Sequence, residues 1–235
     1  MHALLDWRLP GLALAGALLS LDRRAAVQAM LAHPIVASAI AGWLLGDLRC
    51  GLFVGLLLGL LWSGSLPVGG VVPPDETLGA VVATGVAILG ARAAGADLFA
   101  SAFTGFLAGI PAAFAGRRLE LALRRYNGEI AREVEKRVRA GDLAAIESAT
   151  LRALGVAFAG ALLVYGIALA ICVPAAFALL SRHPALFPTL AKAAFPVPIA
   201  GAGAVIAGAG FRLGLAWATL GFAIGLLLLT KGGPL

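Results

Sequence analysis

Long apolar runs recur along this sequence, and only short charged or glycine- and proline-rich stretches separate them. Examples are residues 9–21, 25–45 and 51–63. An α-helix needs about 20 apolar residues to cross a hydrocarbon core of about 30 Å. Apolar residues make up 61% of the chain and charged residues 13%, against about 45–50% and about 25% in soluble domains. The sequence therefore predicts an all-α, polytopic membrane protein and argues against a soluble enzyme or a disordered chain.

Counting such runs predicts about seven to nine membrane elements, one of them broken or re-entrant. The second run contains His33-Pro34, and the broken element covers residues 63–76. That element is apolar, but Gly69-Gly70 loosen its backbone and Pro73-Pro74 remove two backbone donors. Irregular backbone at membrane depth is tolerated where it is buried in protein or lines a cavity. The alternative interpretation is an ordinary external loop.

One long polar stretch, Arg117–Arg152, divides the chain. It contains nine basic and six acidic residues, and an excess of Lys and Arg favours the cytoplasmic side of a membrane. Nucleic-acid binding is not expected, because acidic residues are interleaved with the basic ones. We expect one or two cytoplasmic helices lying over the membrane face, between membrane regions at 1–116 and 153–235. Apolar residues recur there at roughly helical spacing: Leu119, Leu123, Ile130, Val134 and Val138.

Glycines recur at four-residue spacing before the broken element. They form the patterns Gly42-x-x-x-Gly46 and Gly51-x-x-x-Gly55-x-x-x-Gly59. Small residues at this spacing allow two membrane helices to approach closely. The pattern predicts helix packing and does not identify a substrate.

Three aspartates, Asp22, Asp47 and Asp75, lie at the edges of apolar runs. Charges close to a bilayer usually mark a pathway or a paired site. Asp75 follows the two prolines of the broken element, and a carboxylate can accept hydrogen bonds from sugar hydroxyls. Asp75 could equally cap the helix that begins beside it. Asp22 and Asp47 lie near Arg23 and Arg49, so interfacial structural roles are open for both.

The sequence predicts no catalytic residues, metal site or cofactor. His2, His33 and His183 are each isolated, and Cys50 and Cys172 stand alone in apolar stretches. No metal-ligand spacing, phosphate-binding loop or nucleophile motif occurs.

Several short patterns occur together in a fixed order and spacing. They are Leu21-Asp22, His33-Pro34-Ile35-Val36, Gly42-x-x-x-Gly46-Asp47, Gly51-x-x-x-Gly55 and Gly69-Gly70-Val71-Val72-Pro73-Pro74-Asp75. In this combination the chain resembles the membrane C subunit (IIC) of the mannose/fructose/sorbose family of the bacterial phosphoenolpyruvate-dependent sugar phosphotransferase system. The resemblance is best over residues 14–110.

The resemblance implies a translocation subunit in the bacterial inner membrane. The C subunit would pair with a membrane D subunit, as a homo-oligomer of the C/D unit, and carry a sugar across. A cytoplasmic B subunit, phosphorylated on a histidine by an A subunit, would then phosphorylate the sugar. The C subunit carries no phosphohistidine.

The chain departs from the family at one position. The family usually has Glu in a Gly-x-x-Leu-Glu pattern, where this chain has Gly59. Either the substrate differs from a common hexose, or this member is transport-deficient and serves as a regulator or scaffold. The predicted substrate-binding residues are Asp75, Pro74, Gly69, Gly70, Asp22 and Gly59.

Overall fold

The computed structural model describes residues 7–24, 28–63 and 72–208, which form helices and no strand. This confirms the all-α class. The elements are α1 (Arg8–Arg24), α2 (Pro34–Leu44), α3 (Leu48–Trp62), α4 (Glu76–Gly85), the π-helix η2 (Val86–Arg92), α5 (Leu98–Arg139), α6 (Ala144–Arg182), the 3-10 turn η3 (Pro184–Leu186), α7 (Phe187–Ala193) and α8 (Pro196–Gly208).

Helix α4 is the centre of the molecule. Every residue from Thr77 to Gly85 is buried, and α4 packs against α1, α2, α3, α5 and α6. A helix that is apolar on all sides is stable where other helices surround it. Glycines bring α5 close to it: a Cβ on Gly109 would lie 2.8 Å from the Gly79 carbonyl oxygen. The start of α4 is therefore fixed at the junction of several helices.

The second apolar run forms a shorter helix than its length predicts. The sequence predicts a segment from 25 to 45 with His33-Pro34 inside it, but α2 begins at Pro34, with His33 as its N-cap. Proline suits the first helical position because its missing N–H would have no helical partner there. Residues 28–33 instead form a non-helical approach to α2.

The glycine pattern packs α2 against α3, as predicted. A Cβ on Gly51 would lie 2.8 Å from the Gly42 Cα, and a Cβ on Gly55 would lie 2.8 Å from the Ile35 Cα. Gly46 does not belong to this contact. It lies in the turn between the two helices with a φ of +83°, a left-handed conformation that favours glycine.

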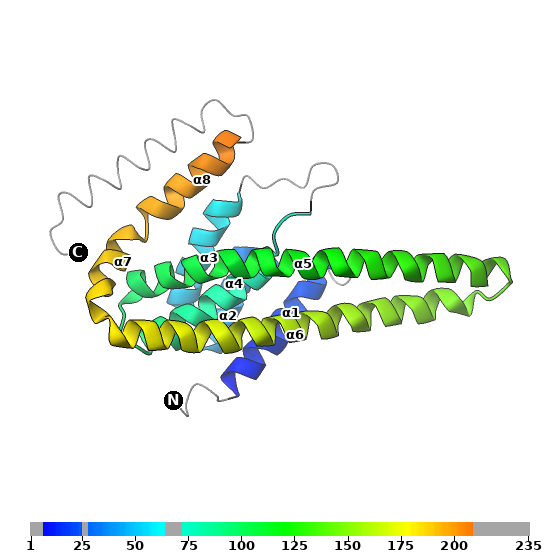
Figure 1. The fold of residues 1–235 in the computed structure, drawn as a ribbon, viewed down its shortest axis with the longest axis horizontal. Helices are drawn as coiled ribbons and strands as arrows, with labels where there is room; N and C mark the ends of the chain where they lie inside the picture. Colours follow the sequence, from blue (N-terminus) through cyan, green and yellow to red (C-terminus); the bar gives the residue numbers. More distant parts are fainter. Residues whose placement is uncertain (1–6, 25–27, 64–71, 209–235) are drawn as a thin grey trace.

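Helices α5 and α6 form a long hairpin that extends well beyond the other helices (Figure 1). One or two separate helices were expected in the charged stretch. The structure instead continues α5 and α6 through it. The 42 residues of α5 correspond to about 63 Å at 1.5 Å per residue, about twice the thickness of a hydrocarbon core. Leu123 and Ile130 are buried along the seam between the two helices.

Two described helices, α5 and α6, are long and apolar enough to cross a membrane. A third span results if the bent pair Pro184–Ala193 and Pro196–Gly203, which meet at 44°, is counted as one. Helices α2 and α3 are apolar but shorter. Over these residues the structure supports a helical membrane protein, and the predicted seven to nine elements are not confirmed.

Candidate functional site

Asp75 ends an irregular segment, residues 72–75, and begins α4. Its Oδ1 accepts a hydrogen bond from the Leu78 amide at 3.1 Å, so it is the N-cap of the central helix. Its own amide donates to the Ala113 carbonyl of α5 at 2.9 Å. Gly116 of α5 lies directly against the Asp75 side chain, where an added Cβ would collide with it. These contacts hold the carboxylate in a fixed, buried position.

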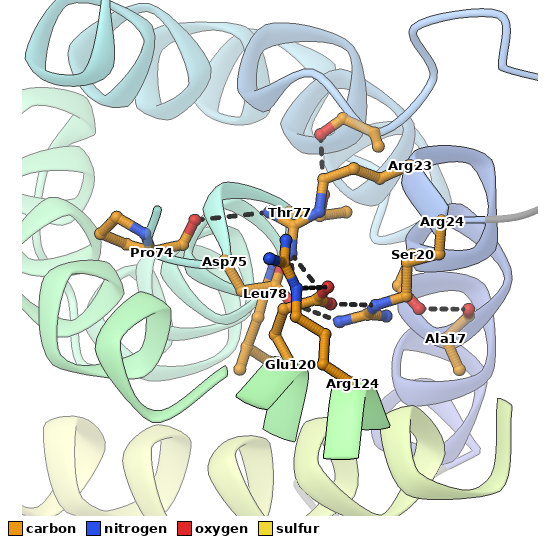
Figure 2. A network of polar contacts seen from close by, with 11 residues as sticks. Ala17, Ser20, Arg23, Arg24, Pro74, Asp75, Thr77, Leu78, Glu120 and Arg124 are labelled. Atoms are coloured by element: carbon orange, nitrogen blue, oxygen red, sulfur yellow. Dashed lines mark hydrogen bonds and ion pairs between the residues drawn. The ribbon is translucent and has the colours of Figure 1, made fainter. Parts of the chain in front are cut away.

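A buried charge cluster surrounds this carboxylate (Figure 2). Arg24, at the end of α1, donates from Nη2 to Asp75 at 2.9 Å and from Nε to Glu120 of α5 at 2.8 Å. Arg23 approaches the same two carboxylates at 3.5 and 3.9 Å. Arg124 lies 3.2 Å from Glu120. The cluster therefore joins α1, the irregular segment, α4 and α5.

The centre of the cluster is largely removed from solvent, whereas Arg124 at its edge is exposed. The side chain of Asp75 is 1% exposed, and that of Arg24 is 10% exposed. Removing such charges from water is costly unless each has partners, which explains why the arginines and carboxylates occur together. Two polar atoms beside them, Arg24 Nη1 and the Tyr165 hydroxyl, are buried without a hydrogen-bond partner among the described residues.

An open surface pocket of about 340 Å³, called the cavity below, lies next to the cluster, between the end of α1 and the start of α4. Arg23 belongs to both, since it lines the cavity and contacts Asp75. The cavity offers carboxylates, an amide, a guanidinium and an imidazole. Its lining residues are Asp22, Arg23, Gln28, Met30, Ala32, His33 and Glu76.

The wall of this cavity between α1 and α2 has an unusual backbone. Gln28 and Met30 have φ angles of +53° and +61°, a left-handed conformation that is uncommon for residues other than glycine. Asp22 holds this wall in place, because its carboxylate accepts hydrogen bonds from the amides of Ala29 at 2.8 Å and Ala32 at 3.2 Å. Strained backbone of this kind tends to occur at functional sites.

The structure separates the residues that the sequence analysis grouped as one site. Asp22 lines the cavity. Asp75 and Pro74 lie behind it, where the Pro74 carbonyl accepts a hydrogen bond from Arg23 at 3.3 Å. Gly59 lies on α3, with a Cβ position 3.1 Å from the side chain of Ile35. Gly69 and Gly70 lie outside the described residues.

No pattern in the sequence predicts the partners of Asp75. Arg24 is 51 residues away from it, and Glu120 was counted only as part of the polar stretch. A local pattern carries no signal for such pairs. The Arg23-Arg24 doublet at the end of an apolar run was the available clue, since arginines near a bilayer usually have acidic partners. Asp47, in contrast, caps α3 and pairs with Arg92 at 2.8 Å, not with its neighbour Arg49.

Comparison with known proteins identifies related families. A family model described as the sorbose-specific IIC component of the PTS (phosphotransferase system) matches residues 7–230. The mannose-specific EIIC component of the PTS from Escherichia coli K12 is 29% identical over 114 residues, which cover 48% of this chain and 40% of that protein. A putative N-acetylgalactosamine permease IIC component 2 from the same strain is 40% identical over 56 residues, or 24% of this chain and 42% of that protein. The chain thus spans about two fifths of the length of these curated relatives.

Two solved structures share the fold. One is described only as a membrane protein, with a TM-score of 0.62 at 19% identity, covering 97% of this chain and 81% of that one. The other is the cryo-electron microscopy structure of the mannose transporter ManYZ with microcin E492, with a TM-score of 0.56 at 20% identity, covering 99% and 88%. At these identities the matches establish the helical architecture.

Proposed function

This chain belongs to the family of sorbose-specific IIC components of the PTS, and we propose that it is a membrane translocation subunit that carries a sugar across the bacterial inner membrane. Partner subunits phosphorylate the sugar as it arrives. The observation that carries this proposal is the cavity beside Asp22 and Glu76, which lies next to the irregular segment and the buried charge cluster.

The chemistry of the cavity suits a polyhydroxyl compound. Sugar hydroxyls both donate and accept hydrogen bonds, and the lining provides acceptors on Asp22 and Glu76, donors on Arg23, and both on Gln28. The volume of about 340 Å³ is at the lower end of the range for small-molecule sites. The substrate path in this proposal includes Asp22, Pro74, Asp75, Gly69, Gly70 and Gly59.

The partners follow from the same proposal. The chain pairs with a membrane D subunit, forms a homo-oligomer of the C/D unit, and receives cytoplasmic A and B subunits that transfer the phosphoryl group. It crosses the membrane several times, and the charged region 117–152 lies on the cytoplasmic side between the membrane regions 1–116 and 153–235. Its nine basic residues support that orientation.

A second candidate is a transport-deficient regulator or scaffold. The observation that favours it is Gly59, which stands where the family usually has Glu and which packs against Ile35 instead of presenting a carboxylate. In that case the fold and its partners are kept, and the sugar is not bound.

Sugar binding to the assembled complex distinguishes the two candidates. The chain is purified with its D subunit, and equilibrium dialysis is performed with mannose, sorbose and N-acetylgalactosamine, the sugars named for the relatives. Saturable binding of one of them supports transport. Glu76→Gln then weakens binding about tenfold, since hydrogen bonds to charged groups contribute about 1.5–3 kcal/mol. Glu135→Gln, at an exposed position on the hairpin, leaves binding unchanged and is the matched control. No binding of any of the three sugars favours the scaffold.

A further inference from the structure

The described groups at the cavity that could bind an anion are already paired with carboxylates of the chain. The clearest case is the wall between α1 and α2, where two backbone amides point at one side chain. The amides of Ala29 and Ala32 donate to the two carboxylate oxygens of Asp22, at 2.8 and 3.2 Å. Successive backbone N–H groups of this kind commonly bind anions. Asp22 therefore occupies the position that an anionic ligand would take.

Arg23 is the one described lining residue with a permanent positive charge, and its guanidinium is shared with the cluster (Figure 2). It lies 3.5 Å from Asp75 and 3.9 Å from Glu120. It also donates to the Pro74 carbonyl oxygen at 3.3 Å. An anion in the cavity would have to compete with these two carboxylates for Arg23.

The N-terminus of α4 borders the cavity through Glu76. The first amides of a helix attract anions, but here Asp75 accepts the hydrogen bond of the Leu78 amide at 3.1 Å. Glu76 adds a second negative charge in the first turn. His33 also acts as an acceptor, because its Nδ1 accepts a hydrogen bond from the Ile35 amide at 3.4 Å, and an accepting ring nitrogen carries no proton.

Carboxylates outnumber guanidinium groups over the cavity and the cluster together. The described residues there supply four carboxylates and three guanidinium groups, which leaves one negative charge uncompensated. Two of the carboxylates, Asp22 and Glu76, line the cavity itself. Like charges brought together in one site repel each other, whereas uncharged hydroxyl groups can donate hydrogen bonds to both carboxylates.

We propose that the cavity accepts uncharged sugars and rejects anionic ones, including the phosphorylated form of the same sugar. This inference rests on the proposed function and narrows its substrate class. A phosphoryl group adds a charge of about −1.5 to −2 at pH 7, so phosphorylation converts a ligand that the cavity accepts into one that it repels. The sugar phosphate therefore does not compete with incoming sugar, and Asp22 and Glu76 are the residues that determine this specificity.

The test compares two ligands of nearly the same shape and different charge. They are the C6 carboxylate and the C6 carboxamide of the neutral sugar that binds to the chain assembled with its D subunit. Each competes with labelled neutral sugar in equilibrium dialysis, and the 6-phosphate is measured beside them. The carboxylate and the phosphate are expected to bind at least about tenfold more weakly than the carboxamide. High salt reduces this difference because it screens charges at an open site, whereas a purely steric effect does not respond to salt.

Glu76→Gln removes one of the repelling charges. The ratio of carboxamide affinity to carboxylate affinity is expected to fall to about threefold or less. Glu76→Asp keeps the charge and retains the ratio. Glu135→Gln changes the net charge equally at an exposed position on the hairpin and leaves the ratio unchanged, which makes it the matched control.

Equal affinities for the carboxylate and the carboxamide in the wild-type complex overturn the proposal, and this comparison needs no variant to fold. A ratio that stays the same in high salt or in Glu76→Gln also overturns it. These outcomes leave the proposed function intact, because the neutral sugar still binds. If no neutral sugar binds at all, the proposed function itself fails, and the inference fails with it.

Discussion

At the scale of single residues, Asp75 has two roles in the structure, because it caps α4 and compensates Arg23 and Arg24. Asp75→Asn separates them. The Asn side-chain oxygen can still accept the Leu78 amide hydrogen bond, but the buried Arg24 loses one of its two carboxylate partners and keeps only Glu120. We expect the free energy of unfolding to fall by about 3 kcal/mol, measured as a lower unfolding midpoint of the purified protein in detergent.

Glu135→Gln is the control for this prediction. Glu135 also pairs with an arginine, Arg139, but both side chains are largely exposed, and exposed pairs contribute about 0–1 kcal/mol. An equal loss of stability in both variants would mean that burial of the cluster does not decide its contribution. No loss in Asp75→Asn would mean that Arg24 finds another partner.

The sequence identifies Asp75 as a candidate site residue but leaves two roles open for it. A carboxylate after two prolines at the edge of an apolar run is compatible with both a cap and a ligand contact. The cap could be predicted, since it depends on residues three apart in the chain. The ion pair could not, because Arg24 and Asp75 meet only after α1 packs beside α4.

At the scale of helices, the contact between α2 and α3 depends on two glycines where backbone meets backbone. Gly51→Ala places a methyl group against the Ser38 carbonyl and 2.8 Å from the Gly42 Cα, so the helices must separate. We expect a loss of about 1–3 kcal/mol, as for other overpacked sites, measured by the unfolding midpoint.

Gly59→Ala is the matched control on the same helix and the same stripe. Its added methyl group meets only the flexible end of Ile35, at 3.1 and 3.3 Å, and the change also raises helix propensity. Stability is expected to be unchanged or slightly higher. A loss as large as that of Gly51→Ala would show that close approach does not govern this helix pair.

The charged hairpin gives a prediction for acidic pH. The hydrogen bond from Arg152 lowers the pKa of Glu133, and that from Arg137 lowers the pKa of Asp142 at the hairpin tip. Both carboxyl groups have folded pKa values below their unfolded values of about 4. The two ion pairs therefore stabilise the folded hairpin fully at pH values above the unfolded-state pKa values. This stabilisation is lost as the pH falls through the lower pKa values of the folded state.

We expect the tip to loosen below about pH 4, and a nitroxide label at position 140 should report this as increased mobility. In a Glu133→Gln, Asp142→Asn double variant the label should already be mobile at pH 7 and change little on acidification. A label whose mobility does not respond to pH in the native hairpin would contradict the roles of these pairs.

The lengths of α5 and α6 were not predicted correctly from the sequence. The polar residues after Ala115 looked like the end of a membrane segment, although no glycine or proline cluster ends the helix there. The recurring apolar positions at 119, 123 and 130 were correctly taken as helical. In the structure α6 packs against α5. An apolar pattern within one helix does not show which other helix covers that face.

At the scale of the whole molecule, the lengths of α5 and α6 and the position of their charges predict orientation. The 39 residues of α6 correspond to about 58 Å, which is longer than a hydrocarbon core of about 30 Å, and we predict that α6 crosses the core with its two ends on opposite sides. If the basic hairpin lies on the cytoplasmic side, as proposed above, the end of α6 near Arg182 is expected to lie outside.

Single cysteines at Ser148 and Ser181, both exposed, test this orientation in a variant with Cys50 and Cys172 replaced by alanine. A membrane-impermeant maleimide should label Ser148→Cys only in inside-out vesicles and Ser181→Cys only in intact cells whose outer membrane is permeabilised. Labelling of both cysteines from one side would mean that α6 does not cross the membrane. Labelling in the opposite sense would place the hairpin outside, where cytoplasmic subunits could not reach it, and the phosphotransferase assignment would lose its structural basis.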